Sequence, residues 1–346
     1  MKIILAITGL CCLIWQAEAQ QVELVAVPAE QRIDVKVDGK LFTAYRYPTT
    51  IKKPVLYPLN AASGVEVTRG YPLAPRPGER VDHPHHVGAW FNFGSVNGHD
   101  FWNNSNDIGP EHKGPFGSIV HRRVIQQKSG RKTGRLVVEA AWLDKDGQEM
   151  LREKTTFLFA GGPNQRSVTR ITTLTALDQP VIFRDNKEGL FAIRVARQLE
   201  APADKPEIFT DANGKITPVA VLDNTGVTGI YTNREGLKGT DFLGNQVWGK
   251  KSAWMILTGI IGGEPVTVAI LDHPQNLNHP AHWQSRGYGL FAINNLGSKV
   301  YDPNQPEFSL SLAPGRSLTF KHKVLVYNAV QPGQTIIDRE WHTFGK

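Results

Sequence analysis

The chain has 346 residues, of which 39 are Lys or Arg and 32 are Asp or Glu, giving a formal charge of +7, and 40% are hydrophobic. This much apolar material excludes a disordered chain, a collagen-like repeat and a coiled coil, because a packed globular core can be built from it. With 33 Gly and 22 Pro, the composition favours many short strands and turns.

The first nineteen residues have the pattern of a secretory signal peptide. Lys2 supplies the positive start, residues 3–15 are apolar, and Ala17-Glu18-Ala19 fits the small-x-small cleavage pattern. We therefore predict cleavage near Ala19 and a secreted or periplasmic protein. The only two cysteines, Cys11 and Cys12, lie in this segment, so we expect a mature chain without disulfides or thiolate ligands.

The rest of the chain gives no sign of a membrane or nucleic-acid partner. No later segment approaches the roughly 20 continuous apolar residues that a membrane-spanning helix needs. The basic residues occur in scattered pairs such as Lys52-Lys53 and Arg122-Arg123. Such pairs are typical of solvated strand ends, so we predict no membrane span and no nucleic-acid binding.

Alternation of apolar and polar residues with a period of two recurs along the chain and predicts β-strands. Turn sequences such as Asp38-Gly39 and Pro314-Gly315 bound these stretches, and only residues 335–342 favour a short helix. The clearest predicted strands are residues 31–37, 135–142, 151–159, 167–177, 254–260 and 318–327. We therefore expect an all-β fold, a large antiparallel β-sandwich that forms a single domain over residues 20–346.

Two further strands are predicted by an internal repeat. The pentapeptide Gly-Leu-Phe-Ala-Ile occurs at residues 189–193 and again at residues 289–293. An identical pentapeptide arises by chance in a chain of this size only about a few times in a hundred. We expect the two copies to be strands in related positions, each preceded by a polar segment.

Long loops punctuated by polar residues, Gly and Pro separate the strands, and such loops commonly carry the functional site of a β scaffold. They cover residues 71–86, 97–116, 200–214, 233–249 and 272–288. Histidines are concentrated in the first and last of these, as Asp82-His83-Pro84-His85-His86 and in residues 272–286.

His83, His273 and His279 each follow Asp or Asn and precede Pro. Proline restricts the residue before it to an extended backbone, and the preceding Asp or Asn could orient the imidazole. An imidazole titrates near neutral pH, so it can act as a general acid or base or as a metal ligand. We predict that the two segments share one rim of the scaffold. The catalytic candidates are His83, His85, His86 and His282, and the substrate-binding candidates are His99, His273 and His279.

Aromatic and charged residues near these loops extend the predicted site. Flat apolar rings among amides and charged groups suit a sugar, whose C–H face packs on an aromatic ring. The ring candidates for substrate binding are Trp102, Trp283 and Tyr288. Asn186 and Glu188 precede the first copy of the repeat and complete the substrate-binding set.

Three more residues are candidates for catalysis. Glu153 shares an alternation face with Leu151 and Phe157, so its carboxyl should point inward. Arg286 precedes the second copy of the repeat and would suit a carboxylate or a developing oxyanion. His121 lies in a stretch that reads as a strand and could serve the site or the scaffold. A divalent metal is an alternative use of the histidines, although no carboxylate stands at a fixed ligand spacing.

At these motifs the chain resembles the bacterial family labelled "methane oxygenase PmoA" or PmoA-like. The resemblance rests on residues 82–86, 97–102, 185–191, 272–274 and 286–291. The resemblance implies a protein that is secreted or found in glycan-degradation settings. It also implies a β-sandwich fold, of which the galactose-mutarotase-like supersandwich is one type. It brings no established catalytic residue. The methane monooxygenase subunit behind the label is an integral membrane protein, so we set methane oxidation aside.

Three functions remain open from the sequence. The first is a carbohydrate-active hydrolase, lyase or epimerase that uses His and Glu as acid and base on a carbohydrate or other polar small molecule. The second is a non-catalytic glycan-binding protein with the same aromatic loops. The third is a metal-dependent enzyme with a histidine-rich site. The number of clustered titratable groups favours the first.

Overall fold

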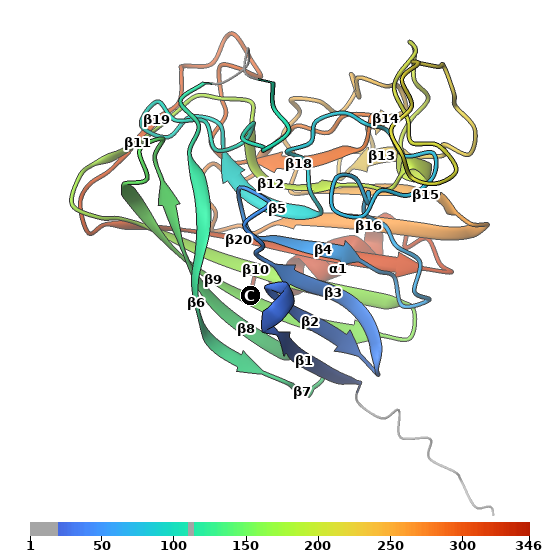
Figure 1. The fold of residues 1–346 in the computed structure, drawn as a ribbon, viewed down its shortest axis with the longest axis horizontal. Coiled ribbons are helices and arrows are strands. Elements are labelled where there is room, and N and C mark those ends of the chain that lie inside the picture. Colours follow the sequence, from blue (N-terminus) through green and yellow to red (C-terminus); the bar gives the residue numbers. More distant parts are fainter. Residues whose placement is uncertain (1–19, 110–113) are drawn as a thin grey trace, which may run out of the picture.

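The structure, a computed structural model, describes residues 20–109 and 114–346. The predicted signal peptide and both cysteines lie outside the described residues. Two nine-stranded antiparallel sheets and one two-stranded sheet account for the strands of the described part (Figure 1). This confirms the predicted all-β fold and the large antiparallel sandwich. No helix formed by the described residues has the length and hydropathy needed to span a membrane.

The first large sheet has the strand order β17-β18-β12-β5-β4-β3-β2-β1-β7. Its strands are β1 (Gln21–Val27), β2 (Arg32–Val37), β3 (Lys40–Arg46), β4 (Val55–Leu59), β5 (Ala89–Phe93), β7 (Gly130–Arg131), β12 (Gly189–Arg194), β17 (His282–Trp283) and β18 (Leu290–Asn294).

The second large sheet has the order β14-β13-β15-β16-β20-β10-β9-β8-β6. Its strands are β6 (Ser118–Lys128), β8 (Gly134–Leu143), β9 (Glu149–Gly162), β10 (Gln165–Ala176), β13 (Ile230–Asn233), β14 (Lys238–Gly239), β15 (Trp254–Ile261), β16 (Glu264–Asp272) and β20 (Ser317–Asn328). The small sheet pairs β11 (Val181–Arg184) with β19 (Ser309–Leu312), and the helical elements are η1 (Pro28–Glu30), η3 (Arg197–Leu199) and α1 (Gln334–Phe344).

The predicted repeat strands are direct neighbours. In β12 and β18 the two copies pair antiparallel, with Ala192 opposite Ala292 and Phe191 opposite Ile293. Because side chains alternate along a strand, both copies present Phe and Ile to the core and Ala to the other face. The prediction of related strands is therefore confirmed.

The main core lies between the two large sheets. Strand β10 alternates half-buried and buried positions along its whole length, which is the period-two pattern read from the sequence. Its inward side chains meet aromatic rings from both sheets, such as Phe91 of β5 and Phe320 of β20, whose centroids are 6.0 Å apart.

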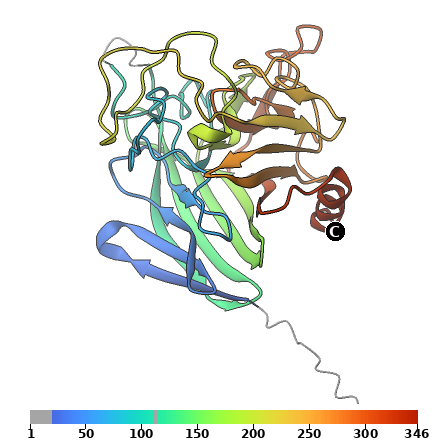
Figure 2. The ribbon, with the colours of Figure 1, turned by 90° about the vertical axis from the view of Figure 1, so that its right-hand side faces the viewer.

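The opposite face of the first sheet is covered by loops instead of a third sheet. A smaller apolar cluster forms there from Trp90, Trp102, Ala192, Leu290 and Ala292. Figures 1 and 2 show long loops gathered above β5, β12 and β18 at one end of the sandwich. Helix α1 lies elsewhere, where Ile337, Trp341 and Phe344 pack on β15, β16 and β20 (Figure 2). The loops over the first sheet therefore hold the places where a ligand could enter.

Candidate functional site

A cavity of about 550 Å³ lies beside the first histidine segment. Its polar lining includes His83, His85, Asp100 and Asn103, and its apolar lining includes Phe116 and Pro84. We call this cavity the His85 pocket. Its walls come from residues 82–86, which precede β5, and from the loop between β5 and β6.

The backbone of the first histidine segment is fixed by buried cations. Arg69, 1% exposed, donates hydrogen bonds from Nη1 to the carbonyl oxygen of Asp82 at 2.9 Å and from Nη2 to those of His83 and His86 at 3.0 and 3.1 Å. Lys53 Nζ donates to the carbonyl oxygen of His85 at 2.8 Å. A loop held by charge-assisted bonds at each turn gives its side chains fixed positions.

Asp82 anchors the same loop through its carboxylate. One oxygen, Oδ1, lies 2.5 Å from both Arg69 and Arg194, and the other, Oδ2, lies 2.7 Å from His83 Nδ1. Burial alone would raise the pKa of Asp82, but Arg194, the hydrogen bond with His83 and Arg69 outweigh it and hold that pKa well below its usual range. The carboxylate of Asp82 and Nδ1 of His83 are therefore bonded within the protein and hold the loop in place.

His85 differs from its neighbours because neither of its ring nitrogens has a hydrogen-bond partner among residues 20–109 and 114–346. The residue is only 8% exposed, and it lines the pocket. Burial, with Lys53 and His83 adding to it, lowers the pKa of His85 well below its usual value. The imidazole is therefore neutral at pH 7, with one nitrogen able to accept a proton and the other able to donate one.

The pocket also presents a carboxylate and lies beside a buried amine. Asp100 accepts hydrogen bonds from the backbone N–H groups of Trp102 and Asn103 at 2.8 and 3.0 Å and from Asn103 Nδ2 at 2.7 Å. These bonds orient the carboxylate and leave it acceptor capacity for a ligand. Lys53 is 3% exposed, and burial lowers its pKa to about 7 although the charge of Asp100 opposes the shift. Groups that titrate near neutral pH are a feature of acid–base sites.

Several predicted residues pack around His85 without lining the pocket. His86 stacks on Trp90 with centroids 5.1 Å apart and meets Trp102 edge-on at 5.6 Å, so Trp102 is packed beneath the loop. Tyr288 stacks on His83 at 5.0 Å. His99 lies nearby in a tight turn, where its backbone pairs with Val96.

The histidines of the second segment do not reach this pocket. His279 Nδ1 bonds to Asp272 at 2.8 Å and its ring stacks on Trp341 of α1, and His273 Nδ1 accepts from the Gln275 N–H at 3.1 Å beside Phe344. The sequence prediction of one rim shared by both segments is therefore wrong. Helix α1, which played no part in that prediction, brings the aromatic rings that these histidines pack against.

His282 and Trp283 also lie apart from the His85 pocket. In β17, His282 is opposite Asn294, at the end of β18 remote from Leu290 and Tyr288. His282 Nδ1 bonds to the Gly249 carbonyl oxygen at 2.8 Å and its ring stacks on Tyr301 at 4.9 Å. Trp283 points into the main core, where its Nε1 donates to the Ser252 carbonyl oxygen.

The predicted residues around the repeat strands are tied into local contacts. Arg286 donates to the Leu243 carbonyl oxygen at 2.9 Å and covers the ring of Trp248. Glu188 accepts from Gln284 at 2.8 Å, and Asn186 Oδ1 accepts from the Glu188 N–H at 2.8 Å. Their contacts are with residues near the repeat strands and the 241–249 loop, and they lie outside the pocket lining.

Glu153 points inward as predicted, but its carboxylate is paired. Its Oε1 lies 2.6 Å from Arg170 Nη2, and its Oε2 accepts from Trp142 Nε1 at 2.9 Å, both in the main core. Because both carboxylate oxygens are bonded to core side chains, Glu153 offers no free group to a ligand. The prediction of a catalytic Glu153 is therefore not supported by its position.

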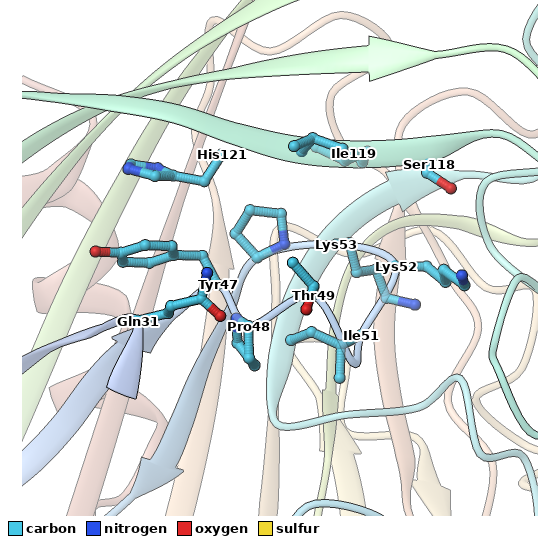
Figure 3. Close-up of a pocket in the computed structure, with 12 residues that line it drawn as sticks. Gln31, Tyr47, Pro48, Thr49, Ile51, Lys52, Lys53, Ser118, Ile119 and His121 are labelled. Carbon is cyan, nitrogen blue, oxygen red and sulfur yellow. The ribbon is translucent and has the colours of Figure 1, made fainter. Parts of the chain in front are cut away.

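His121 lines a second cavity, of about 480 Å³, between the end of β3 and the start of β6 (Figure 3). Its ring stacks on Tyr47 with centroids 4.1 Å apart, and its Nδ1 lies 3.1 Å from the Tyr45 hydroxyl. We call this space the Tyr47 cavity. It does not include any residue of the first histidine segment.

Sequence reasoning missed four residues of the His85 pocket and its support, namely Lys53, Asp100, Asn103 and Phe116. The expectation that Lys52-Lys53 is a solvated pair is wrong for Lys53, which is buried against Trp90 and the His85 carbonyl oxygen. Asp100 and Asn103 are next in the chain to His99 and Trp102, which were predicted. The loop that contains those two residues was therefore the sequence feature from which Asp100 and Asn103 could have been found. No group of three or more His, Cys, Asp or Glu side chains within the described ranges is arranged to hold a metal ion.

The sequence matches the model of a family described as "Family of unknown function (DUF6807)" over residues 32–342, so the chain belongs to that family. This description carries no PmoA-like label, and that resemblance stays a prediction. No curated protein matches the sequence.

Among solved structures, the chain is similar to the galactosidase domain of an alpha-galactosidase-sucrose kinase, AgaSK, with 8% identity and a TM-score of 0.41 over 88% of this chain and 41% of that chain. It is also similar to the Slr1438 protein from Synechocystis sp. PCC 6803, with 10% identity and a TM-score of 0.31 over 88% and 95% of the two chains. The chain spans less than half the length of the first. Similarity at this level carries no argument about function.

Proposed function

We propose that this DUF6807 protein is a carbohydrate-active enzyme that uses acid–base chemistry in the His85 pocket, in a secreted or periplasmic setting. The observation that carries the proposal is the buried, neutral His85, which is among the residues lining the pocket and whose ring nitrogens are both buried without a partner among the described residues. A buried polar group without a partner costs free energy, so its retention suggests a use for its hydrogen-bonding capacity.

The pocket supports a role for each of its groups. His85 accepts a proton from the substrate at one ring nitrogen and can return it to the product, which serves a hydrolase, a lyase or an epimerase equally. Asp100 and Asn103 accept and donate hydrogen bonds to ring hydroxyls, and Phe116 offers an apolar surface for the C–H face of the ring. Lys53 is a positioning residue, since it holds the backbone of His85.

The test is a screen of the purified protein against oligosaccharides, including oxidised sugars, followed by His85→Gln on the substrate found. Loss of a true general acid or base lowers turnover by about a hundred-fold or more, and we expect this of His85→Gln. His282→Gln is the matched control, because His282 is a buried histidine like His85 but lies outside the pocket, where it stacks on Tyr301. We expect its turnover to stay within about twofold of the parent.

Two outcomes would overturn the proposal. If His85→Gln folds normally and keeps parental turnover, catalysis lies elsewhere. If no sugar is turned over but sugars bind in a manner that Phe116→Ala abolishes, the protein is a glycan-binding protein. Elemental analysis of the purified protein, with turnover measured after chelation, tests the metal-dependent alternative.

A further inference from the structure

The Tyr47 cavity differs in charge from the His85 pocket. The charged side chains among the described residues that line the cavity are Lys52 and Lys53, and none of these lining residues is Asp or Glu. The lining of the His85 pocket, in contrast, includes the carboxylates of Asp100 and Asp107. Since Lys53 Nζ is bonded to the His85 carbonyl oxygen, Lys52 is the cation that the cavity offers, and a lining with a cation and no carboxylate favours an anionic ligand.

The polar groups of the Tyr47 cavity lie along its length, among the apolar side chains of Pro48, Ile51 and Ile119. Figure 3 shows His121 and Tyr47 side by side at one end, Lys52 and Ser118 at the other, and Thr49 between the two ends. The Tyr45 hydroxyl, 3.1 Å from His121 Nδ1, fixes the imidazole against Tyr47. Hydroxyl donors and a flat aromatic surface suit a sugar ring, and an ammonium group suits a carboxylate on that ring.

Lys52 is free to serve this purpose. Within the part of the chain that the structure describes, no carboxylate lies within ion-pair distance of its ammonium group. Its backbone is fixed, because the Lys52 carbonyl oxygen accepts from the Ile119 N–H of β6 at 2.8 Å. Two residues earlier in the chain, the Thr50 carbonyl oxygen accepts from Asn106 Nδ2 at 2.9 Å.

The two cavities adjoin along residues 50–53. A small space of about 20 Å³ is lined by Lys52 and Lys53 on one side and by Pro84 and His85 on the other. A further cavity of about 500 Å³ shares Lys52 with the Tyr47 cavity and Phe116 with the His85 pocket. The two cavities are therefore neighbours, with shared lining residues along the path between them.

We propose that the Tyr47 cavity is a subsite for a carboxylate-bearing sugar, held by Lys52, in an acidic oligosaccharide whose neighbouring ring occupies the His85 pocket. This inference rests on the proposed function, because it names the substrate class of the neighbouring His85 pocket. It requires no bond to form or break in the Tyr47 cavity, only recognition of the carboxylate.

Calorimetric titration with matched ligands tests the inference. The probes are trimers of galacturonate, mannuronate and guluronate, each compared with its methyl ester, which has the same ring and no charge. We expect at least one acid to bind about tenfold or more tightly than its ester, with an advantage that shrinks as salt is raised. Lys52→Gln should remove that advantage and leave ester binding unchanged. Lys128→Gln, at the exposed end of β6 remote from the residues that line the cavity, is the control and should alter neither.

The results separate this inference from the proposed function. If every acid and its ester bind the parent protein equally, or if Lys52→Gln weakens both alike, the subsite for a carboxylate is overturned even when neutral sugars are turned over. If the acid advantage depends on Lys52 but no sugar is turned over, the subsite stands and the enzyme proposal fails. His85→Gln should retain acid binding to within about threefold while it loses turnover, because the carboxylate contact lies in the other cavity.

Discussion

The two histidine-rich segments share one sequence form and have different environments. In both, an Asp fixes an imidazole, as Asp82 does for His83 and Asp272 does for His279. Only the first segment adds His85, which is among the residues lining a cavity and whose ring nitrogens have no hydrogen-bond partner among the described residues. The difference teaches that a histidine bonded to a buried Asp has a structural role, even where, as with Asp272 and His279, the two are not adjacent in the chain. The unpaired histidine of the first segment marks the candidate site.

The two Asp residues also differ in how they are paired. Asp82 lies between the guanidinium groups of Arg69 and Arg194, both buried. Asp272 accepts from the amides of Asn276 and Asn295 at 2.7 and 3.1 Å in addition to its bond with His279. The first segment is therefore held by charge, and the second by neutral polar groups.

The largest expected effect comes from removing the charge that holds the first segment. Asp82→Ala leaves Arg69 and Arg194 buried beside each other without their shared carboxylate, which should lower the free energy of unfolding by about 3–5 kcal/mol. Urea denaturation measures this change. Asp146→Ala, at a 65% exposed side chain, is the control and should change stability by less than about 0.5 kcal/mol. Equal small effects of both variants would show that the Arg–Asp contacts do not hold the loop.

The buried polar groups around Asp272, which include His322 of β20, should make stability depend on pH. Burial, opposed by Asp272, lowers the pKa of His322 to about 4, and the ring lies between Phe191 and Phe320. The unfolded chain binds this proton below about pH 6.5, and the folded chain does not until about pH 4. The contribution of neutral His322 is therefore fully present above pH 6.5 and is lost as the pH falls toward 4, by about 2 kcal/mol at pH 5.

His322→Phe isolates this contribution, because it keeps a ring in the stack and cannot titrate. Urea denaturation at pH 7.5 and pH 5 should show that the parent loses about 2 kcal/mol more than the variant over this interval. The variant also leaves Asn295 Oδ1 without its His322 partner, which lowers stability equally at both pH values. Parallel losses in parent and variant would mean that His322 does not stay neutral in the folded protein.

The sequence predicted the scaffold better than the site, for a physical reason. A sheet residue in a two-layer sandwich faces either the core or the other side, so alternation along β9, β10 and β20 reveals these strands directly. The repeat at residues 189–193 and 289–293 likewise revealed two neighbouring strands. The short helix predicted at residues 335–342 is present as α1 over Gln334–Phe344.

Which loops meet depends on contacts that no local pattern encodes. Glu153 reads as an inward carboxylate, but nothing near it in the chain announces that Arg170 is its partner on the next strand. Lys53 reads as half of a solvated pair because its buried partner, the carbonyl oxygen of His85, lies more than thirty residues away. The histidines at 273 and 279 could not be separated from the site without knowing where α1 packs.

The smallest expected effect concerns Tyr288, the residue of the second segment that touches the first. Its ring stacks on His83 at 5.0 Å, and Arg194 lies 5.1 Å from the ring centroid on its face. Tyr288→Leu removes these two contacts and the one with the Phe242 ring, 5.7 Å away, while keeping apolar volume, and should lower the free energy of unfolding by about 1–2 kcal/mol. Tyr288→Phe keeps the ring and should cost less than about 0.5 kcal/mol, since none of the ring contacts involves the hydroxyl. The two variants together thus measure the stacking of Tyr288 on His83, the only ring stacking between the two loops within the described residues. Equal losses of stability in both variants would assign the effect to the hydroxyl instead.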